Sequence, residues 1–270
     1  MPSINTAVLD IKRLDLLANG TSPLHRLDSR AKVLVTGIFI VTVVSFNRYD
    51  LAALLPFFIF PAVMIAIGRL PALFIIKKIA LLCPFVLIIG IFNPLFDREI
   101  IVHFGFFGIS GGWISFISIV VRSILTVGAA MILVGVTGFT AICQALERMG
   151  LPRAFTVQLL FLYRYIFVLA EEGKRSSMAR QLRSFGKKGL GLASFSSLIG
   201  HLLLRTWRRA ERIHMAMIAR GFTGRFHARG KSHFGKAELG FVLGWSSLFI
   251  LLRVQNVAQW VGHLVTGVFS

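Results

Sequence analysis

One glycine-rich stretch has residue types that could hold phosphate. Residues 224–232 read Gly-Arg-Phe-His-Ala-Arg-Gly-Lys-Ser, close to the nucleotide-binding loop in which backbone N–H groups and a lysine hold the phosphates. The two framing glycines stand one residue too far apart, and no buried strand is indicated before them. We therefore predict that this chain does not itself bind the phosphates of ATP.

The histidines are a second set of residues with possible chemistry, because imidazole is a common metal ligand. A metal site needs several ligands that converge on one point, and these histidines show no paired spacing beside cysteines or carboxylates. They are His25, His103, His201, His214, His227, His233 and His263. We predict neither a resident metal nor another cofactor.

Acidic residues are scarce in the apolar part of the chain. Asp97 and Glu99 fall in a predicted outer loop, and no two carboxylates are paired within an apolar segment. Proton relays and self-contained secondary transporters place ionisable groups inside the membrane. We predict no catalytic residue and no proton pathway in this chain.

The composition is that of a membrane protein, so any functional residue must be positioned by membrane helices or by segments next to them. The 270 residues are 56% hydrophobic with a mean hydropathy of +0.76, too apolar for a soluble domain. Cys83 and Cys143 stand in apolar or membrane-proximal sequence, so we predict that they do not form a disulfide. Residues 1–21 are too polar for a cleavable signal peptide, and the first membrane span is expected to direct insertion.

Apolar segments predict an all-α polytopic membrane protein with about five transmembrane helices. Four segments, residues 31–46, 51–68, 75–92 and 113–138, approach the ~20 residues that a span requires. Pro56, Pro61 and Pro84 lie inside them and predict kinks supported by neighbouring helices. A fifth segment, residues 239–252, is long enough only if it begins near Lys236 and tolerates Arg253.

The region between the fourth and fifth spans is strongly basic. Residues 141–236 hold 18 Lys and Arg against 4 Asp and Glu, which gives +14 of the formal charge of +19. Each Lys or Arg at the centre of a bilayer costs roughly 2.5–3.5 kcal/mol on insertion scales, so this region is expected at the cytoplasmic membrane face. Attraction to anionic lipid is an alternative explanation of the charge. No nucleic-acid-binding module accompanies it.

The distribution of Lys and Arg also predicts the orientation. Basic residues precede the first span and separate the second from the third, which places the N-terminus in the cytoplasm. Residues 47–50 and 93–112 then face outward, and the second of these loops could form a short hairpin. The predicted divisions are an N-terminal segment (1–30), spans one to four (31–138), a cytoplasmic helical module (139–236), and a last span with a tail (237–270).

Two long amphipathic helices are predicted in the basic region. The first starts after Pro152 and stops near Gly186, and the second follows a glycine-rich interruption and ends at Gly221, which can adopt the left-handed conformation. Their apolar residues recur every three or four positions. They are Phe155, Leu159, Leu162, Ile166 and Leu169 in the first helix, and Ile199, Leu203, Thr206, Ala210, Ile213 and Met217 in the second. A pair of helices that lie on the membrane surface is the alternative interpretation.

Two Ala-Arg steps, 40 residues apart, stand at the ends of these helices, and a third motif lies near the N-terminus. The steps are Ala179-Arg180-Gln181 and Ala219-Arg220-Gly221. They resemble the paired Ala-Arg-Gly motifs of the T components of energy-coupling factor transporters, except that Gln181 replaces a glycine. The segment with His25, Leu27, Asp28, Arg30 and Lys32 is similar to the N-terminal motif of that family. Residues 159–172 and 209–212 resemble its cobalt-transport branch, the CbiQ type.

The resemblance implies a non-catalytic transmembrane subunit of a cobalt importer in a bacterial cytoplasmic (inner) membrane. Its partners would be two ABC-type ATPase subunits and a membrane subunit that binds the metal, besides the lipid itself. Each arginine would offer its planar fork to a carboxylate in an ATPase groove. A third Ala-Arg step, in the Ala-Arg-Gly of residues 228–230, lies beyond the second helix and is taken as coincidental.

Three other functions stay open at this stage. The substrate could be nickel, or the chain could serve interchangeable vitamin-binding subunits. A membrane enzyme acting on lipid or polyprenyl substrates is the alternative from a different class. It would need acidic metal ligands or a nucleophile at the membrane face, and the sequence offers neither in a recognisable arrangement.

Overall fold

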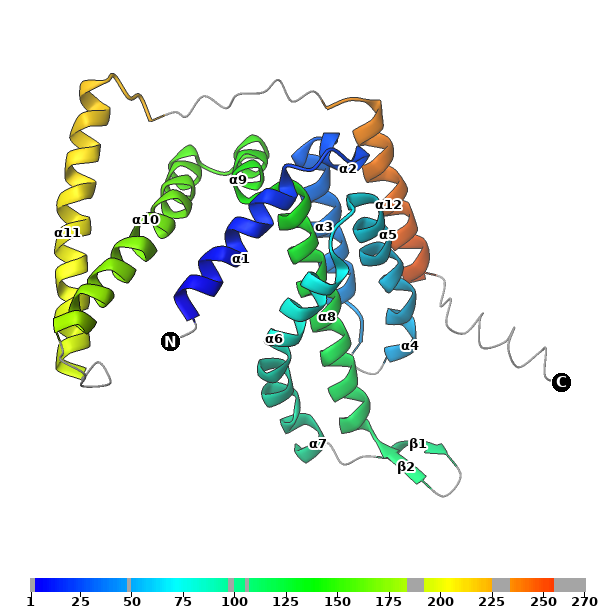
Figure 1. Ribbon diagram of the computed structural model, residues 1–270. Coiled ribbons are helices and arrows are strands. Elements are labelled where there is room, and N and C mark those ends of the chain that lie inside the picture. The colour runs from blue at the N-terminus through cyan, green and yellow to red at the C-terminus, as the bar shows by residue number, and fades with distance from the viewer. Residues whose placement is uncertain are drawn as a thin grey trace. The chain divides into compact units, whose positions relative to one another are not determined.

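The computed structural model describes residues 3–47, 50–96, 100–104, 107–183, 192–224 and 234–254. Over these residues the chain is a succession of helices with one short β-hairpin (Figure 1), which confirms the predicted fold class. The elements are α1 (Ser3–Ala18), α2 (Pro23–Arg26), α3 (Ser29–Val44), α4 (Leu51–Leu54), the 3₁₀ helix η1 (Leu55–Phe58), α5 (Ile59–Gly68), α6 (Ala72–Gly90), α7 (Phe92–Phe96), β1 (Ile100–Phe104), β2 (Phe107–Ser110), α8 (Gly111–Thr137), α9 (Phe139–Arg148), α10 (Arg153–Arg183), α11 (Leu192–Ala219) and α12 (Lys236–Val254).

Five helical stretches are long and apolar enough to cross a membrane, as predicted, but they are not all the predicted ones. The five are Leu51–Gly68, Ala72–Pro94, Gly111–Thr137, Arg153–Arg180 and Lys236–Val254. The first predicted span corresponds to α3, whose 16 residues extend only about 24 Å at 1.5 Å per residue. Arg153–Arg180 lies in the region predicted to be cytoplasmic. The protein is thus a multi-pass membrane protein.

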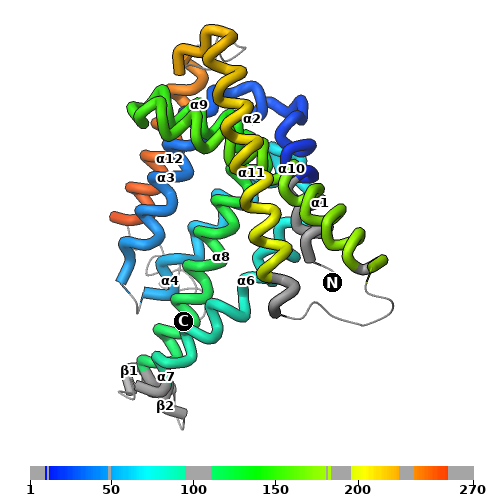
Figure 2. The backbone as a smooth tube through the Cα atoms, turned by 90° about the vertical axis from the view of Figure 1, so that its left-hand side faces the viewer, coloured from blue at the N-terminus to red at the C-terminus, as the bar shows by residue number. Residues whose placement is uncertain are grey.

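The chain divides into two compact units. Leu14–Ile142 and Lys231–Ser270 form the first, called the membrane unit, and Met1–Arg13 and Cys143–Gly230 form the second, called the basic unit. In the membrane unit α8 is the central helix, because α3, α5, α6 and α7 all pack against it. Figure 2 shows α8 running alongside α6 and α3.

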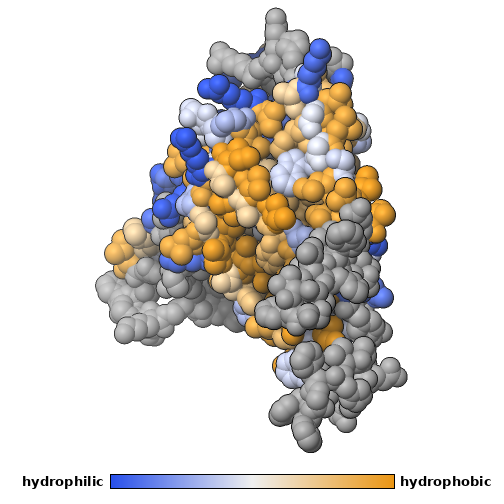
Figure 3. Space-filling model, turned by 90° about the vertical axis from the view of Figure 1, so that its right-hand side faces the viewer, coloured by the Kyte–Doolittle hydropathy of each residue, from blue (hydrophilic) through white to orange (hydrophobic). Residues whose placement is uncertain are grey.

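The core of the membrane unit is a cluster of aromatic rings. Phe39 of α3 packs against Phe60 of α5 with ring centroids 4.5 Å apart, and against Phe249 of α12 at 5.4 Å. All three side chains are at most 2% exposed. The outer surface on the side of α12 is largely apolar (Figure 3), as a lipid-facing surface requires.

The last span, α12, accommodates its terminal arginine through local contacts. The Arg253 guanidinium lies 4.2 Å from the ring centroid of Phe46, and its Nη2 donates to the Ser45 carbonyl oxygen at 3.0 Å. A cation over an aromatic ring is stabilised by the ring quadrupole. The prediction that this span begins at Lys236 and tolerates Arg253 is confirmed.

The structure around the prolines and in the outer loop agrees in part with the predictions from the sequence. The backbone tightens into the 3₁₀ helix η1 at Pro56, whereas Pro61 and Pro84 lie inside continuous α-helices. Strands β1 and β2 pair antiparallel, which confirms the hairpin. Both cysteines are free thiols. Residues 225–232 of the glycine-rich stretch, the predicted break at 186–191 and the tail 255–270 lie outside the described residues.

Candidate functional site

The N-terminal motif begins with a histidine that closes the turn between α1 and α2. Nε2 of His25 donates to the Leu17 carbonyl oxygen at 3.0 Å, and in the neutral imidazole Nδ1 accepts from the Ser22 hydroxyl at 2.7 Å. The ring lies so close to Gly20 that a Cβ added there would be 2.8 Å from His25 Cε1. His25 therefore ties the end of α1 to the start of α2, and Gly20 leaves space for it.

The other residues of this motif set the start of α3. Asp28 is the N-cap, because its Oδ1 accepts from the Arg30 backbone N–H at 2.9 Å. Asp28 is also the acidic group near Lys32, which is only 2% exposed. Leu27 is partly buried against the core. The motif acts structurally here: it forms an elbow from which α3 begins, and α12 packs on α3.

The second Ala-Arg step has the geometry of a capped helix end. The backbone N–H of Gly221 donates to the Ile218 carbonyl at 2.9 Å, and that of Phe222 to the Met217 carbonyl at 3.0 Å. Gly221 has φ +74°. These two bonds and the left-handed glycine define a Schellman motif, so the predicted helix end is confirmed. Ala219 and Arg220 are exposed beside it.

The first Ala-Arg step lies in the last turn of α10, near the helix end as predicted. The described helix continues through residue 181 to Arg183, so this step does not itself terminate the helix, unlike the second one. Ala179 is exposed and Arg180 is partly exposed, while the side chain of Gln181 lies outside the described part. Without a glycine after the arginine, the backbone has no left-handed position at which to leave the helix.

The helices α10 and α11 contact each other near the middle of the pair. Gly173 of α10 lies against the side chain of Leu202, and the carboxylate of Glu172 accepts a hydrogen bond from the guanidinium of Arg205. The two Ala-Arg steps lie on opposite sides of this crossing. Arg220 is 15 residues beyond Arg205 along α11, which corresponds to roughly 22 Å of helix. Arg180 and Arg220, which lie on opposite sides of the crossing, thus cannot serve one small binding site.

Two clefts of different chemistry lie between α10 and α11. The apolar groove, about 590 Å³, is lined mainly by residues before the crossing on α10 and after it on α11. The basic cleft, about 1310 Å³, contains Arg180. The apolar groove includes Phe161, Tyr165, Leu203, Trp207, Met217 and Phe222. The basic cleft includes Arg180, Arg183, His201, Arg205, Arg208 and Arg212.

The apolar stripes predicted on these helices are largely exposed. Phe155 is 63% exposed, Leu162 59% and Leu203 65%. Lone apolar residues on a surface are ordinary, but contiguous apolar faces mark sites of contact with proteins or lipid. The helices therefore present apolar surface that the described part of this chain does not cover.

Arg122 is an ionisable residue inside a span that no sequence pattern predicted. Its guanidinium donates to the Asn47 carbonyl oxygen at the end of α3, and Asp50 is the nearby acidic group. Charged residues within membrane spans are paired with carbonyls or opposite charges. Arg122 thus ties α8 to the loop after α3. An arginine in an otherwise apolar run was the signal that could have identified it.

The described residues offer neither a metal site nor a serine nucleophile in a recognised setting. No group of three or more His, Cys, Asp and Glu side chains gathers there in a way that could hold a metal. Residues 108–112 read Gly-Ile-Ser-Gly-Gly, a literal serine-nucleophile pattern that the sequence reasoning overlooked. In α/β-hydrolases that pattern lies on the turn from a strand of the central sheet into a helix. Here it joins β2 to α8, so the strand belongs to a two-stranded antiparallel hairpin and not to a central parallel sheet.

Comparison with known proteins identifies what this architecture is similar to. Residues 20–231 match the family model CbiQ, described as cobalt transport protein. The energy-coupling factor transporter transmembrane protein EcfT of Bacillus subtilis is 27% identical over 76% of this chain and 82% of its own length. The cobalt transport protein CbiQ of Salmonella typhimurium is 31% identical over 39% of this chain and 48% of its own. A putative fused cobalt transport protein CbiMQ of Methanocorpusculum labreanum is 35% identical over 33% of this chain, which spans only 15% of that longer protein.

Proposed function

The chain belongs to the CbiQ cobalt transport protein family, and from this membership we propose that it is the transmembrane coupling subunit of an energy-coupling factor importer for cobalt ions. As a T component it would transmit ATP-driven motion from two ATPase subunits to a membrane subunit that binds the metal. The observation that carries the proposal is the pair of Ala-Arg steps on long helices that cross.

Each Ala-Arg step would engage one ATPase subunit. Arg220 is exposed beside a capped helix end, and Arg180 is partly exposed on the other side of the crossing. An arginine fork binds a carboxylate through two parallel hydrogen bonds, and a neighbouring alanine lets a groove approach closely. Two separated arginines suit two copies of an ATPase, which move toward each other when they bind ATP.

The exposed apolar surface of α10 and α11 would receive the metal-binding membrane subunit. Phe155, Leu162 and Leu203 are more than half exposed, and the apolar groove lies beside them. A contiguous exposed apolar surface of this kind marks a site of contact with another apolar protein surface. Motion of the helix ends would in this way reach the subunit that holds the cobalt.

ATP hydrolysis would reside in the partner subunits and not in this chain. The test is to purify the chain after expression alone and after co-expression with ABC-type ATPase subunits from the same organism. We expect the ATPase to co-purify with the wild-type chain, and the isolated chain to hydrolyse no ATP. Hydrolysis by the clean, isolated chain would contradict the assignment, as would failure of any ATPase to co-purify when all subunits are expressed.

The proposed location is the bacterial cytoplasmic membrane, with the N-terminus and residues 139–236 on the cytoplasmic side. A single cysteine at position 187 (Lys187→Cys) in a chain without Cys83 and Cys143 should resist an impermeant thiol reagent added to intact cells. A single cysteine at position 109 (Ile109→Cys) should react. The reverse labelling pattern would overturn this orientation.

Uptake measurements test which metal the transporter carries. The matched family is named for cobalt, whereas several relatives are named only as energy-coupling factor components. Cells that express the whole transporter are therefore given labelled cobalt, nickel and a vitamin in parallel. Cobalt uptake that requires this chain supports the proposal. Uptake of only nickel or only the vitamin would contradict cobalt as the substrate and identify the transported substrate instead.

A further inference from the structure

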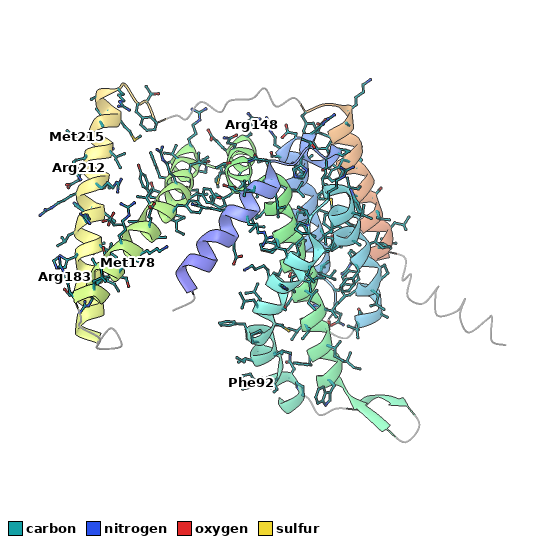
Figure 4. The ribbon with its side chains drawn as sticks, viewed as in Figure 1. Phe92, Arg148, Met178, Arg183, Arg212 and Met215 are labelled. Carbon is teal, nitrogen blue, oxygen red and sulfur yellow. The ribbon has the colours of Figure 1, made fainter. Side chains whose placement is uncertain are left out.

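The basic cleft is formed by two stripes of side chains that face each other. On α11, positions 197, 201, 205, 208 and 212 recur at spacings of four and three, and on α10 positions 176, 180 and 183 do the same. Residues at these spacings share one face of a helix. Four arginines besides Arg180, and His201, therefore line one cleft of about 1310 Å³. Figure 4 labels Arg183 on α10 and Arg212 on α11, one from each helix.

The positive charge of this cleft is poorly balanced by the chain itself. Arg205 pairs with Glu172, and Glu211 accepts from the Trp207 indole N–H at 2.8 Å. Within the described residues, no ion pair joins a carboxylate to Arg183, Arg208 or Arg212. Arginine clusters without internal partners favour a bound anion, above all one with several phosphate oxygens.

The same cleft also has an apolar component. Leu198, Leu202 and Leu204 line it together with the arginines. On the same two helices Leu182 is 79% exposed, and Trp207, which lines the apolar groove, is 66% exposed. A free phosphate ion would gain nothing from leucines, whereas a phospholipid has both an anionic head and acyl chains. Helices with arginines on one face and Trp and Leu on another bind at the headgroup level of a bilayer.

We propose that the basic cleft between α10 and α11 binds the phosphate headgroup of an anionic phospholipid, with Arg208 and Arg212, one helical turn apart on α11, as its ligands. The acyl chains would lie against the adjoining leucines. The bound lipid would hold the two helices at the membrane surface, where α10 passes from its apolar half to its charged half. This site goes beyond the proposed coupling role, and lipid binding can be measured whether or not the chain transports cobalt.

The test is native mass spectrometry of the full chain in detergent, titrated with phosphatidylglycerol or with phosphatidylcholine of the same acyl chains. The variant Arg208→Gln/Arg212→Gln removes two charges from the cleft. The matched control, Arg148→Gln/Arg209→Gln, removes two exposed charges that do not line it. We expect the first variant to bind phosphatidylglycerol about thirtyfold more weakly, the factor that two arginines contribute at a membrane surface, and the control to bind as the wild type does.

Several outcomes would overturn the proposal. Equal loss in both variants would show a general charge effect, and no loss in either would show that the cleft is not the site. If inorganic phosphate displaces the lipid as effectively as added phosphatidylglycerol, the ligand is a soluble phosphate instead. If the cleft variant keeps its lipid but loses the ATPase subunits, the cleft is a protein interface. Equal helix content by circular dichroism shows that both variants are folded.

Discussion

The membrane unit and the α10–α11 pair are both built from long helices, but they bury their side chains very differently. In the membrane unit α3, α5, α8 and α12 contribute buried apolar side chains to one core, whereas no apolar side chain among the described residues of α10 and α11 is buried. Thr156 is the one fully buried side chain of α10 and α11 among their described residues. The membrane unit satisfies its own core, and the helix pair leaves its apolar faces for other molecules.

This difference shows that amphipathic periodicity alone does not tell a core helix from an interface helix. The apolar stripe of α10 repeats as regularly as that of a buried helix, yet most of it is exposed. The difference lies in the partners available within the chain: α8 is surrounded by α3, α5 and α6, whereas the main packing of α10 among the described residues is its crossing with α11, beside a contact between Lys12 and the Phe167 ring. A helix with a strong apolar face and few partners in its own chain exposes a surface for contact with another protein or with lipid.

The largest expected effect comes from the core of the membrane unit. Phe39→Ala removes a fully buried ring that contacts Phe57, Phe60 and Phe249. The cavity should lower the free energy of unfolding by about 3–5 kcal/mol. The effect is expected near the lower end of that range, because lipid weakens the hydrophobic contribution. Thermal unfolding in detergent, followed by circular dichroism, measures it.

Leu203→Ala is the matched change in the helix pair. Leu203 is 65% exposed, so its loss should change the free energy of unfolding by less than about 0.5 kcal/mol. A loss comparable to that of Phe39→Ala would mean that the apolar face of α11 is buried in the isolated chain, and the contrast between the two regions would fail.

The sequence predicted most of the membrane helices, but it predicted neither α1 nor the contacts between α10 and α11. Long apolar runs define α6 and α8 within three residues, because a span must be apolar along its whole length. α1 was missed, since Asp10, Lys12 and Asp15 interrupt its apolar residues. The Glu172–Arg205 pair joins residues 33 positions apart, and no local pattern encodes such a contact.

The candidate site was predictable to a similar degree. Gly221 was recognised as a helix end because a left-handed position selects glycine, and the structure has φ +74° there. The elbow at His25 and Asp28 was recognised only as a motif, because its hydrogen bonds depend on how α1 and α3 are placed. The end of α10 was predicted near Gly186, and the described helix runs past Gln181 to Arg183, because no residue near Gln181 stops a helix.

A smaller effect is expected from the cap of α11. In Gly221→Ala an added Cβ would meet no atom within 4 Å, so the cost is backbone strain alone, about 1–2 kcal/mol. Fraying of the helix end should also lower the amount of ATPase that co-purifies. Gly200→Ala is the control, because this helical glycine also has open space and alanine there should stabilise α11 by roughly 0.5–1 kcal/mol. Equal co-purification by both variants would argue against a role for the cap.

A small effect on stability is also expected from the ion pair at the helix crossing. Arg205 is 68% exposed and Glu172 23%, so Glu172→Arg should cost no more than about 1 kcal/mol. The angle between the helices should nevertheless broaden, which spin labels at the outer ends of α10 and α11 would measure. The exchanged pair, Glu172→Arg/Arg205→Glu, should restore the narrow distance distribution. If the single variant leaves the distribution unchanged, the pair does not set the crossing.

The central claim is that the helix pair couples ATPase subunits to metal uptake through Arg180 and Arg220. The most direct measurement is uptake of radiolabelled cobalt by cells with the whole transporter and equal membrane amounts of each variant. Losing one partner of a buried charge pair typically costs about 2–5 kcal/mol, so Arg180→Glu/Arg220→Glu should abolish uptake, and Arg220→Glu alone should impair it more than Arg180→Glu. Arg229→Glu, in the coincidental Ala-Arg-Gly, should transport normally. Normal uptake by the double variant, or the greatest loss in Arg229→Glu, would contradict the account.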